Sequence, residues 1–199
     1  MVIYQGEEGL VTEYYLDFET EGLDPSRHKI ITIQYQELDM RTGSPKGSLT
    51  ILREWESSEA EIVSRFLEVL NPTNDFDFIP VGFNLRFELF FLRERVARVL
   101  NQRLDDRWVF YGLPRIDIKS TLVMINGGRL KGTTLDWFVR KEAPNWKIPD
   151  LYHAGEFDAI ERYFRDEAEK FVHAYRFLKQ ELPPLYQKYL RERSYSRNP

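Results

Sequence analysis

The stretch YYLDFETEGLDP, residues 14–25, places acidic side chains at the end of an apolar segment. Its aromatic and aliphatic residues predict a buried β-strand. Because side chains alternate along a strand, Asp17 and Glu19 would leave it on the same face. Two neighbouring carboxylates repel each other unless a cation or a proton stabilises them. The pair is compatible with a cation site, but for an isolated Asp-x-Glu a local cap at Asp17 and a turn at Glu19 are the better explanation.

A second acidic position follows a later predicted strand, in VGFNLRFELFFL at residues 81–92. Asn84 suits the N-cap of the helix that starts here, and Glu88 lies four residues on, on the same helix face. Ligands of open α/β sheets bind just beyond such strand ends. Taken alone, however, this pair is better explained by capping and by the favourable effect of Glu88 on the helix dipole.

A third candidate lies in the C-terminal helix, in IERYFRDEAEKFVHAYRFL at residues 160–178. Tyr163 and Glu167 are four residues apart, so they share a helix face beside the apolar stripe. A solvated charged face is the simpler explanation of this segment in isolation. Asp166 would replace Glu167 if the helix were turned differently, and the spacing of His153 and Asp158 offers a further alternative.

In this order, the three segments resemble the motifs of the DEDD, or DnaQ-like, family of 3′–5′ exonucleases. LDFETEGLDP is similar to the first motif, Asp-x-Glu followed by Thr-x-Gly-Leu, and VGFNLRFELFFL to the second, Gly-His/Tyr-Asn-x-x-Phe-Asp. LYHAGEFDAIERYFRDE resembles the tyrosine-type third motif, Tyr-x-x-x-Asp. Glu88 and Glu167 stand where the family has aspartates. The resemblance spans about residues 13–180.

The resemblance implies a two-metal site that holds Mg²⁺ or Mn²⁺. Its metal ligands would be carboxylates from all three motifs, namely Asp17, Glu19, Glu88 and Glu167. Tyr163 would orient the attacking water as a fifth catalytic residue. The substrate-binding residues would be Thr20, Leu23, Phe83 and Asn84, with Leu23 under the terminal base. Asp158 in the histidine branch of the family, or Asp166, stays open as the fourth carboxylate, and Asp117 is assigned a structural role.

The same resemblance implies an RNase H-like fold, and the pattern of elements agrees with an α/β class. Three strands at 13–18, 30–37 and 48–53 predict an antiparallel meander, followed by strands at 78–83 and 115–118. Helices are predicted at 57–70, 84–100, 119–125, 134–141 and 156–182, the last ended by Pro183 and Pro184. The segment after Pro184 also suits one or two further helical turns. We therefore expect three layers, with a mixed five-stranded sheet between helices. One domain is expected over residues 1–199, with a loose tail from about residue 191.

Composition restricts the kind of metal and partner. The 199 residues include no cysteine and three histidines, which argues against thiolate and imidazole zinc sites and favours hard ions bound by oxygen. The net charge of −4 argues against indiscriminate nucleic-acid binding. Residues 113–147 nevertheless carry seven basic and three acidic side chains, a local excess of 7 − 3 = +4. Solvated helix faces explain this excess as well as a phosphate-binding track does, but a basic segment beside an acidic site suits a metal-dependent nuclease.

The sequence thus predicts a 3′–5′ exonuclease that releases mononucleotides from single-stranded nucleic acid, with DNA favoured. A catalytically weak or inactive nucleic-acid-binding domain of the same fold, or a ribonuclease acting on short RNA, is the alternative. No apolar run reaches the roughly 20 residues of a membrane helix, and no secretory signal is visible, so we expect a cytoplasmic protein without membrane contact. The 15% aromatic content leaves room for a homo-oligomer.

Overall fold

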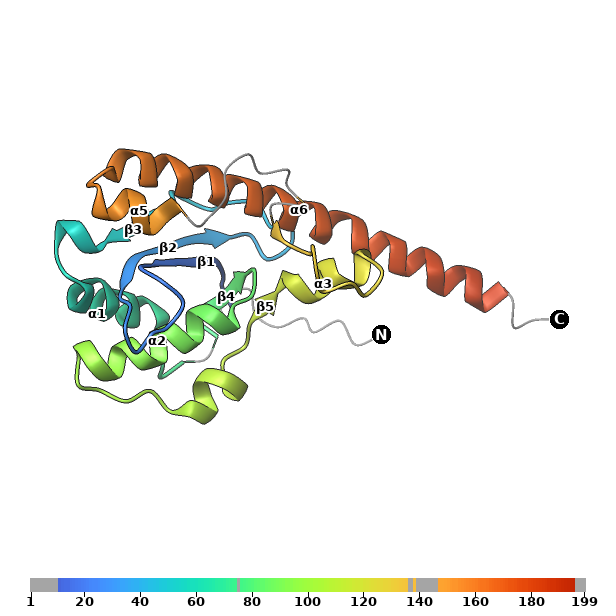
Figure 1. The fold of residues 1–199 in the computed structure, drawn as a ribbon. Helices are drawn as coiled ribbons and strands as arrows, with labels where there is room; N and C mark the ends of the chain where they lie inside the picture. The colour runs from blue at the N-terminus through green and yellow to red at the C-terminus, as the bar shows by residue number, and fades with distance from the viewer. Residues whose placement is uncertain (1–10, 75, 136–137, 139–146, 196–199) are drawn as a thin grey trace.

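The computed structural model describes residues 11–74, 76–135, 138 and 147–195 (Figure 1). The strands are β1 (Glu13–Thr20), β2 (Ile30–Leu38), β3 (Thr50–Arg53), β4 (Ile79–Gly82) and β5 (Ile116–Asp117). The α-helices are α1 (Glu59–Leu70), α2 (Arg86–Val99), α3 (Ile118–Ile125), α5 (Ile148–His153) and α6 (Phe157–Tyr195). Short helical turns, η1 (Glu54–Glu56) and η2 (Trp108–Gly112), and helix α5 were not expected from the sequence.

The five strands form one mixed sheet in the order β3-β2-β1-β4-β5. Strands β1, β2 and β3 pair antiparallel, as the predicted meander requires. Helices α1 and α2 then return the chain in the same direction, so β4 pairs parallel with β1 and β5 parallel with β4. The predicted mixed five-stranded α/β sheet is confirmed, and β1 lies at its centre.

The two faces of β1 pack against different helices (Figure 1). Leu16 and Phe18 enter a core with α1 and α2, whereas Tyr15 enters a second core with α6, where its ring lies 4.9 Å from that of Phe171. Since side chains alternate along a strand, Asp17 and Glu19 share the face of Tyr15. Both acids are therefore directed toward the layer that contains α6.

Buried contacts fix the rotation of α6 against the sheet. Phe164 and Phe171 are almost fully buried. Further along the helix, the Tyr175 hydroxyl donates to Glu13 at 2.9 Å and Lys179 donates to the other oxygen of Glu13 at 2.7 Å. Glu13 lies on β1 four residues before Asp17, and therefore on the same face of the strand. These contacts determine which α6 side chains face the acidic end of β1.

A buried ion pair holds the loop that follows β1. Arg95 of α2 donates to both carboxylate oxygens of Glu59 at 2.7 and 2.6 Å, and to the carbonyl of Pro25 at 3.0 Å. Glu59 in turn accepts from the Ile30 backbone amide at 2.8 Å. The loop at residues 21–29, which carries Leu23, is thereby tied to α1, α2 and β2.

Helix starts differ in how well local sequence predicted them. The sequence offers Ser57 or Ser58 as the cap of the helix that follows. Ser58 caps α1, accepting from the Glu61 backbone amide at 3.2 Å. Asn84 does not cap α2, which begins after Leu85 and has no side-chain cap. The Asn84 side chain instead accepts a hydrogen bond from a distant lysine, described below. The apolar spacing of the segment predicts Phe90 on the buried face of the helix, but Phe90 is 46% exposed.

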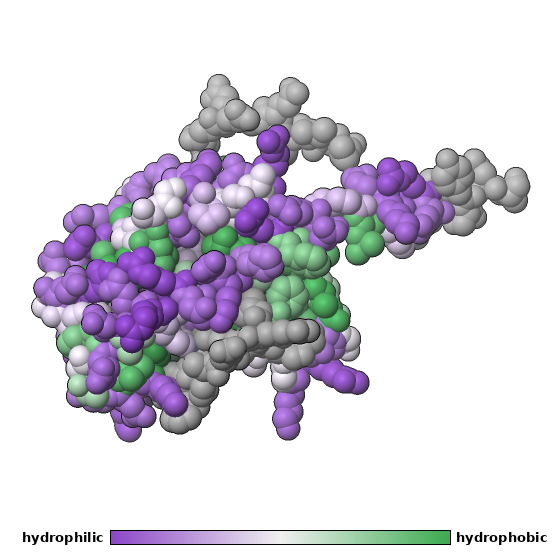
Figure 2. All heavy atoms as spheres, turned by 90° about the horizontal axis from the view of Figure 1, so that it is seen from above, coloured by the Kyte–Doolittle hydropathy of each residue, from purple (hydrophilic) through white to green (hydrophobic). Residues whose placement is uncertain are grey.

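The predicted end of the last helix at Pro183 and Pro184 is wrong, because α6 continues to Tyr195. A helical proline removes one hydrogen bond and crowds the preceding turn, at a cost of about 3 kcal/mol. Here the prolines lie where α6 extends beyond the sheet, and the exposed end is mostly hydrophilic (Figures 1 and 2), so water can satisfy the released carbonyls. The expected helix at 134–141 falls largely outside the described residues. No helix in the described ranges is long and apolar enough to span a membrane.

Candidate active site

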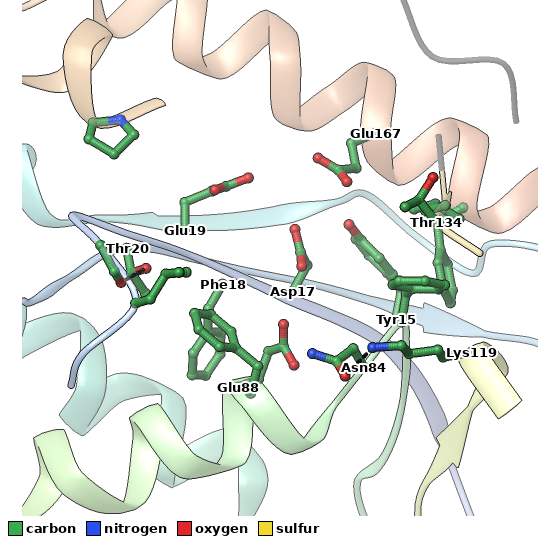
Figure 3. Close-up of a pocket in the computed structure, with 17 residues that line it drawn as sticks. Tyr15, Asp17, Phe18, Glu19, Thr20, Asn84, Glu88, Lys119, Thr134 and Glu167 are labelled. Carbon is green, nitrogen blue, oxygen red and sulfur yellow. Dashed lines mark hydrogen bonds between the residues drawn. The ribbon is translucent and has the colours of Figure 1, made fainter. Parts of the chain in front are cut away.

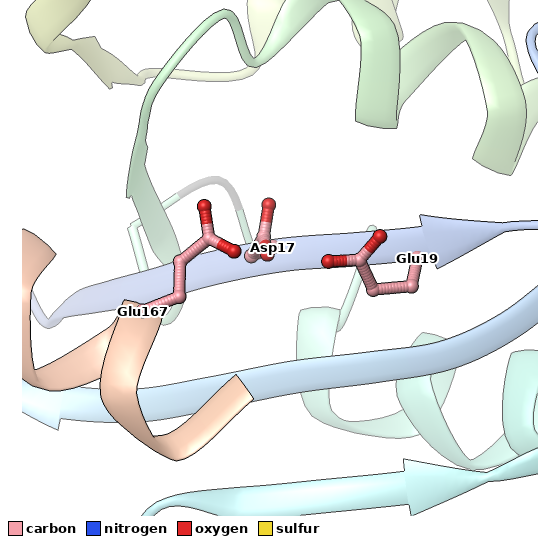
Figure 4. Close-up of side chains that lie close together, drawn as sticks. All are labelled: Asp17, Glu19 and Glu167. Carbon is pink, nitrogen blue, oxygen red and sulfur yellow. The ribbon is translucent and has the colours of Figure 1, made fainter. Parts of the chain in front are cut away.

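Three carboxylates from two distant segments meet on the α6 side of the sheet (Figure 4). Asp17 and Glu19 come from β1, which continues to Thr20, so Glu19 lies on the strand and not in a turn. Glu167 comes from α6. Each residue offers an oxygen, and these oxygens all lie within 4.8 Å of one another. Such a cluster of hard oxygen ligands can hold a divalent cation such as Mg²⁺ or Mn²⁺.

Glu88, from the first turn of α2, supplies a fourth carboxylate to the same cavity. It is 5% exposed, and within the described part of the chain its Oε2 has no hydrogen-bond partner. Burial raises the pKa of Glu88 well above its usual 4.5, and the negative charge of Asp17 raises it further. A buried acid that faces another carboxylate fits a site in which a cation provides the missing stabilisation.

These groups line a cavity of about 590 Å³ between β1, α2, α3 and α6 (Figure 3). In Figure 3 the carboxylates of Asp17, Glu88 and Glu167 point toward one another, with Glu19 further along β1. Tyr15 also lines the cavity, with its hydroxyl directed toward Asp17. Burial raises the pKa of this hydroxyl well above 10, and the charges of Asp17 and Glu167 add to the effect.

All four residues expected to bind substrate line the cavity, in different ways. Leu23 is 84% exposed, so its apolar side chain is accessible to a ligand. Phe83 is half-buried. The Thr20 hydroxyl donates to the Gly22 carbonyl at 2.7 Å, which stabilises the turn beneath Leu23. Thr20 thus acts on the loop in this structure.

Asn84 has a left-handed backbone, with φ of 67°, and belongs to a small polar network. Its backbone N–H donates to the Asp117 carboxylate at 2.9 Å, and its side-chain oxygen accepts from the Lys119 ammonium group at 2.8 Å. Asp117 also caps α3 by accepting from the Lys119 backbone amide at 3.0 Å. This agrees with the structural role expected for Asp117. Lys119 was not singled out from the sequence, where only its place in the basic segment could have indicated it.

Tyr163 stands on α6 one turn before Glu167 and donates a hydrogen bond to it. Burial raises its pKa above the usual 10, and the charges of Glu167 and Glu19 raise it further. Its hydroxyl therefore stays protonated at physiological pH. It can donate a hydrogen bond, but it cannot serve as a strong base.

The alternative carboxylates lie away from the cluster. Asp166 is exposed and forms an ion pair with Lys170 at 2.7 Å. His153 and Asp158 are also exposed. Among the described residues, none of these three lines the cavity. The rotation of α6 therefore presents Glu167 to Asp17 and Glu19.

The sequence matches no protein-family model and no curated protein. Its structure is similar to that of E. coli exonuclease I in complex with a dT13 oligonucleotide, with a TM-score of 0.60 and 14% identity. The similarity covers 89% of this chain and 43% of exonuclease I. A zinc-bound form of the E. coli enzyme with single-stranded DNA gives a TM-score of 0.60, and a product-bound exonuclease I gives 0.58, each at 14% identity. They cover 89% of this chain and 42% and 45% of theirs.

This chain therefore spans less than half the length of the exonuclease I chains that it resembles. At 14% identity the likeness concerns the arrangement of helices and strands. Together with the sheet order β3-β2-β1-β4-β5, it shows that the chain has the RNase H-like fold.

Proposed function

We propose that this chain is a metal-dependent 3′–5′ exonuclease that releases mononucleotides from single-stranded nucleic acid, with DNA favoured. The observation that carries the proposal is the meeting of Asp17, Glu19 and Glu167 within 4.8 Å, at a cavity that also contains buried Glu88. Similar folds are known bound to single-stranded DNA and to zinc, which supports both the substrate and the use of a cation.

The four carboxylates would hold two Mg²⁺ or Mn²⁺ ions. Such ions lower the pKa of bound water and offset negative charge on the attacked phosphate. The longer side chain at position 167 is compatible with this role, since a Glu167 oxygen lies within 4.8 Å of oxygens of both strand acids. Glu88 lies outside this three-residue group, although it lines the same cavity. Glutamate thus serves in a position where the related motif has aspartate.

The other residues would bind and orient the substrate. Exposed Leu23 and half-buried Phe83 offer apolar surfaces for bases, which stack on such side chains without sequence preference. Tyr163, protonated and hydrogen-bonded to Glu167, would orient the attacking water. Asn84 would contact the sugar–phosphate backbone. The basic side chains near α3 favour the approach of a polyanion.

The proposal is tested with 5′-labelled single-stranded DNA and RNA oligonucleotides, incubated with the protein in Mg²⁺, Mn²⁺ or EDTA. A ladder that shortens from the 3′ end with either ion, and no cleavage in EDTA, is the expected result. Intact oligonucleotides under every condition would reject the enzyme. Oligonucleotides that are bound but never cut would instead identify a non-catalytic nucleic-acid-binding domain.

Replacing Tyr163 with phenylalanine removes the hydrogen bond to Glu167 and is expected to lower kcat by about 10²-fold. KM should change little, because the ring remains. Because the wild-type Tyr163 hydroxyl keeps its proton, the ratio of the wild-type kcat to the Tyr163→Phe kcat should stay constant up to about pH 9. Tyr111→Phe, at an 88% exposed position, is the matched control. A ratio that rises steadily with pH would show that Tyr163 acts as a base.

A further inference from the structure

The cavity has one wall of carboxylates and, opposite to it, a single cation. Lys119 is the only lysine or arginine among the described residues that line the cavity. It stands in the first turn of α3, on the far side of β4 from Glu167. Figure 3 places its ammonium group beside Asn84, across from the acids of β1 and α6.

Contacts hold the Lys119 ammonium group at this wall. Its Nζ donates to the Asn84 side-chain oxygen at 2.8 Å and lies 5.7 Å from the centre of the Phe83 ring. Because the amide oxygen of Asn84 is turned to Lys119, the amide nitrogen is turned toward Asp17 and Glu88 (Figure 3). An ammonium group has three donors, of which Asn84 takes one. Lys119 and Asn84 together thus present hydrogen-bond donors beside an aromatic ring.

Folding does not require this placement of the Lys119 side chain. The cap of α3 depends on the backbone amide of Lys119, which donates to Asp117 at 3.0 Å. Asp117 also accepts from the backbone amide of Asn84. The side chain could therefore point to solvent without loss of either bond, yet it lies in the cavity. The hydrogen bond to Asn84 and the contact with the Phe83 ring keep it there, and the cap of α3 needs neither of them.

We infer that Lys119 and the Asn84 side-chain amide form a subsite for one phosphate of the nucleic-acid backbone, next to a base that packs on Phe83. This inference rests on the proposed function and specifies the substrate contacts of the same site. A phosphodiester brings negative charge to a cavity that already contains acids, so a cation at its edge favours entry. An ammonium group binds phosphate oxygen as a point charge, without distinguishing DNA from RNA.

Binding can be measured apart from cleavage in an Asp17→Asn background, by fluorescence anisotropy with a labelled oligothymidylate in Mg²⁺. Adding Lys119→Met is expected to weaken binding about tenfold, the usual effect of one lost charge-assisted hydrogen bond. The slope of log affinity against log salt concentration should also fall in magnitude by about 0.7, the value for one phosphate contact on a single strand.

The position of the contact follows from oligonucleotides in which one phosphodiester at a time is replaced by a neutral methylphosphonate. In the protein with Lys119, a methylphosphonate at one linkage near the 3′ end should weaken binding about tenfold. In the Lys119→Met variant, the methylphosphonate at that linkage should change the affinity little. Lys188→Met, a similar change at an exposed position on the far part of α6, is the control and should bind like the parent. Lys119→Arg should restore most of the affinity.

Equal affinity of the Lys119→Met variant and the parent would overturn the inference. Equal losses at every linkage in both proteins would also overturn it, since they would mean that Lys119 contacts no particular phosphate. Neither result depends on cleavage, so the subsite can fail while the wild-type protein proves to be a nuclease. Conversely, the subsite can hold in a protein that binds single strands without cutting them.

Discussion

Replacement of Asp17 with asparagine is expected to lower the rate of 3′-end hydrolysis by about 10³-fold or more, because this carboxylate is shared by every part of the candidate metal site. It belongs to the cluster with Glu19 and Glu167, and its charge also acts on buried Glu88. Asparagine keeps the size of the side chain. It also removes one of several repelling charges, so the fold should survive. The measurement is kcat/KM with labelled single-stranded DNA, together with the thermal midpoint.

Asp166→Asn is the matched control, since it makes the same chemical change next to Glu167. Asp166 is exposed and pairs with Lys170 at the surface. We expect its activity to remain within about twofold of wild type, because surface ion pairs contribute little. Full activity of the Asp17→Asn variant would contradict the proposed metal site. A comparable loss in Asp166→Asn would mean that α6 presents a different face to the substrate.

The second large effect concerns the pH dependence of stability in the absence of metal. The pKa of Glu88 in the folded protein lies well above its usual 4.5, because of burial and the nearby charge of Asp17. The folded state therefore retains a proton that the unfolded chain loses. Its contribution to stability is fully present below about pH 4.5 and is lost as the pH rises through the raised pKa. Between about pH 4.5 and the raised pKa of Glu88, the free energy of unfolding should fall by up to about 1.4 kcal/mol per pH unit.

Glu88→Gln should remove this pH dependence, because glutamine has nearly the same shape and does not ionise. In EDTA the variant should be more stable than wild type at alkaline pH, and denaturant unfolding at a series of pH values measures the difference. Adding Mg²⁺ or Mn²⁺ should stabilise wild type more than the variant. Glu61→Gln, at an exposed position on α1, is the control and should follow wild type. Identical pH profiles for wild type and Glu88→Gln would contradict the assignment.

Much of the fold could be predicted from local patterns. The alternation in β1 places Asp17 and Glu19 on one face, because side chains of a strand alternate whatever it pairs with. Ser58 caps α1 because its hydroxyl reaches an amide three residues away. The mixed sheet follows from the predicted order of strands and helices. The first two features depend on neighbours within a few residues, whereas the sheet follows from the order of elements along the whole chain.

Asn84 shows where local reasoning fails. Its position before a helix favours capping. Its side-chain oxygen instead accepts a hydrogen bond from Lys119, 35 residues later, and its backbone amide donates to Asp117. The prolines of α6 show the same limit in the other direction. Their local preference to end a helix is overridden, and α6 continues to Tyr195. Each outcome depends on groups that the local pattern does not include.

By itself, the sequence determined the acidic face of β1 and the order of the five strands, and its lack of cysteine favours oxygen ligands for any metal. Only the tertiary structure shows that Glu167, and not Asp166 or Asp158, lies beside Asp17 and Glu19. The rotation of α6 is set by burial of Phe164 and Phe171 and by the contacts with Glu13 on β1. Adjacent positions on a helix point about 100° apart. Presenting Asp166 would therefore require α6 to turn by about 100°, and the long-range contacts of Phe164, Phe171 and Tyr175 hold the helix in the observed rotation.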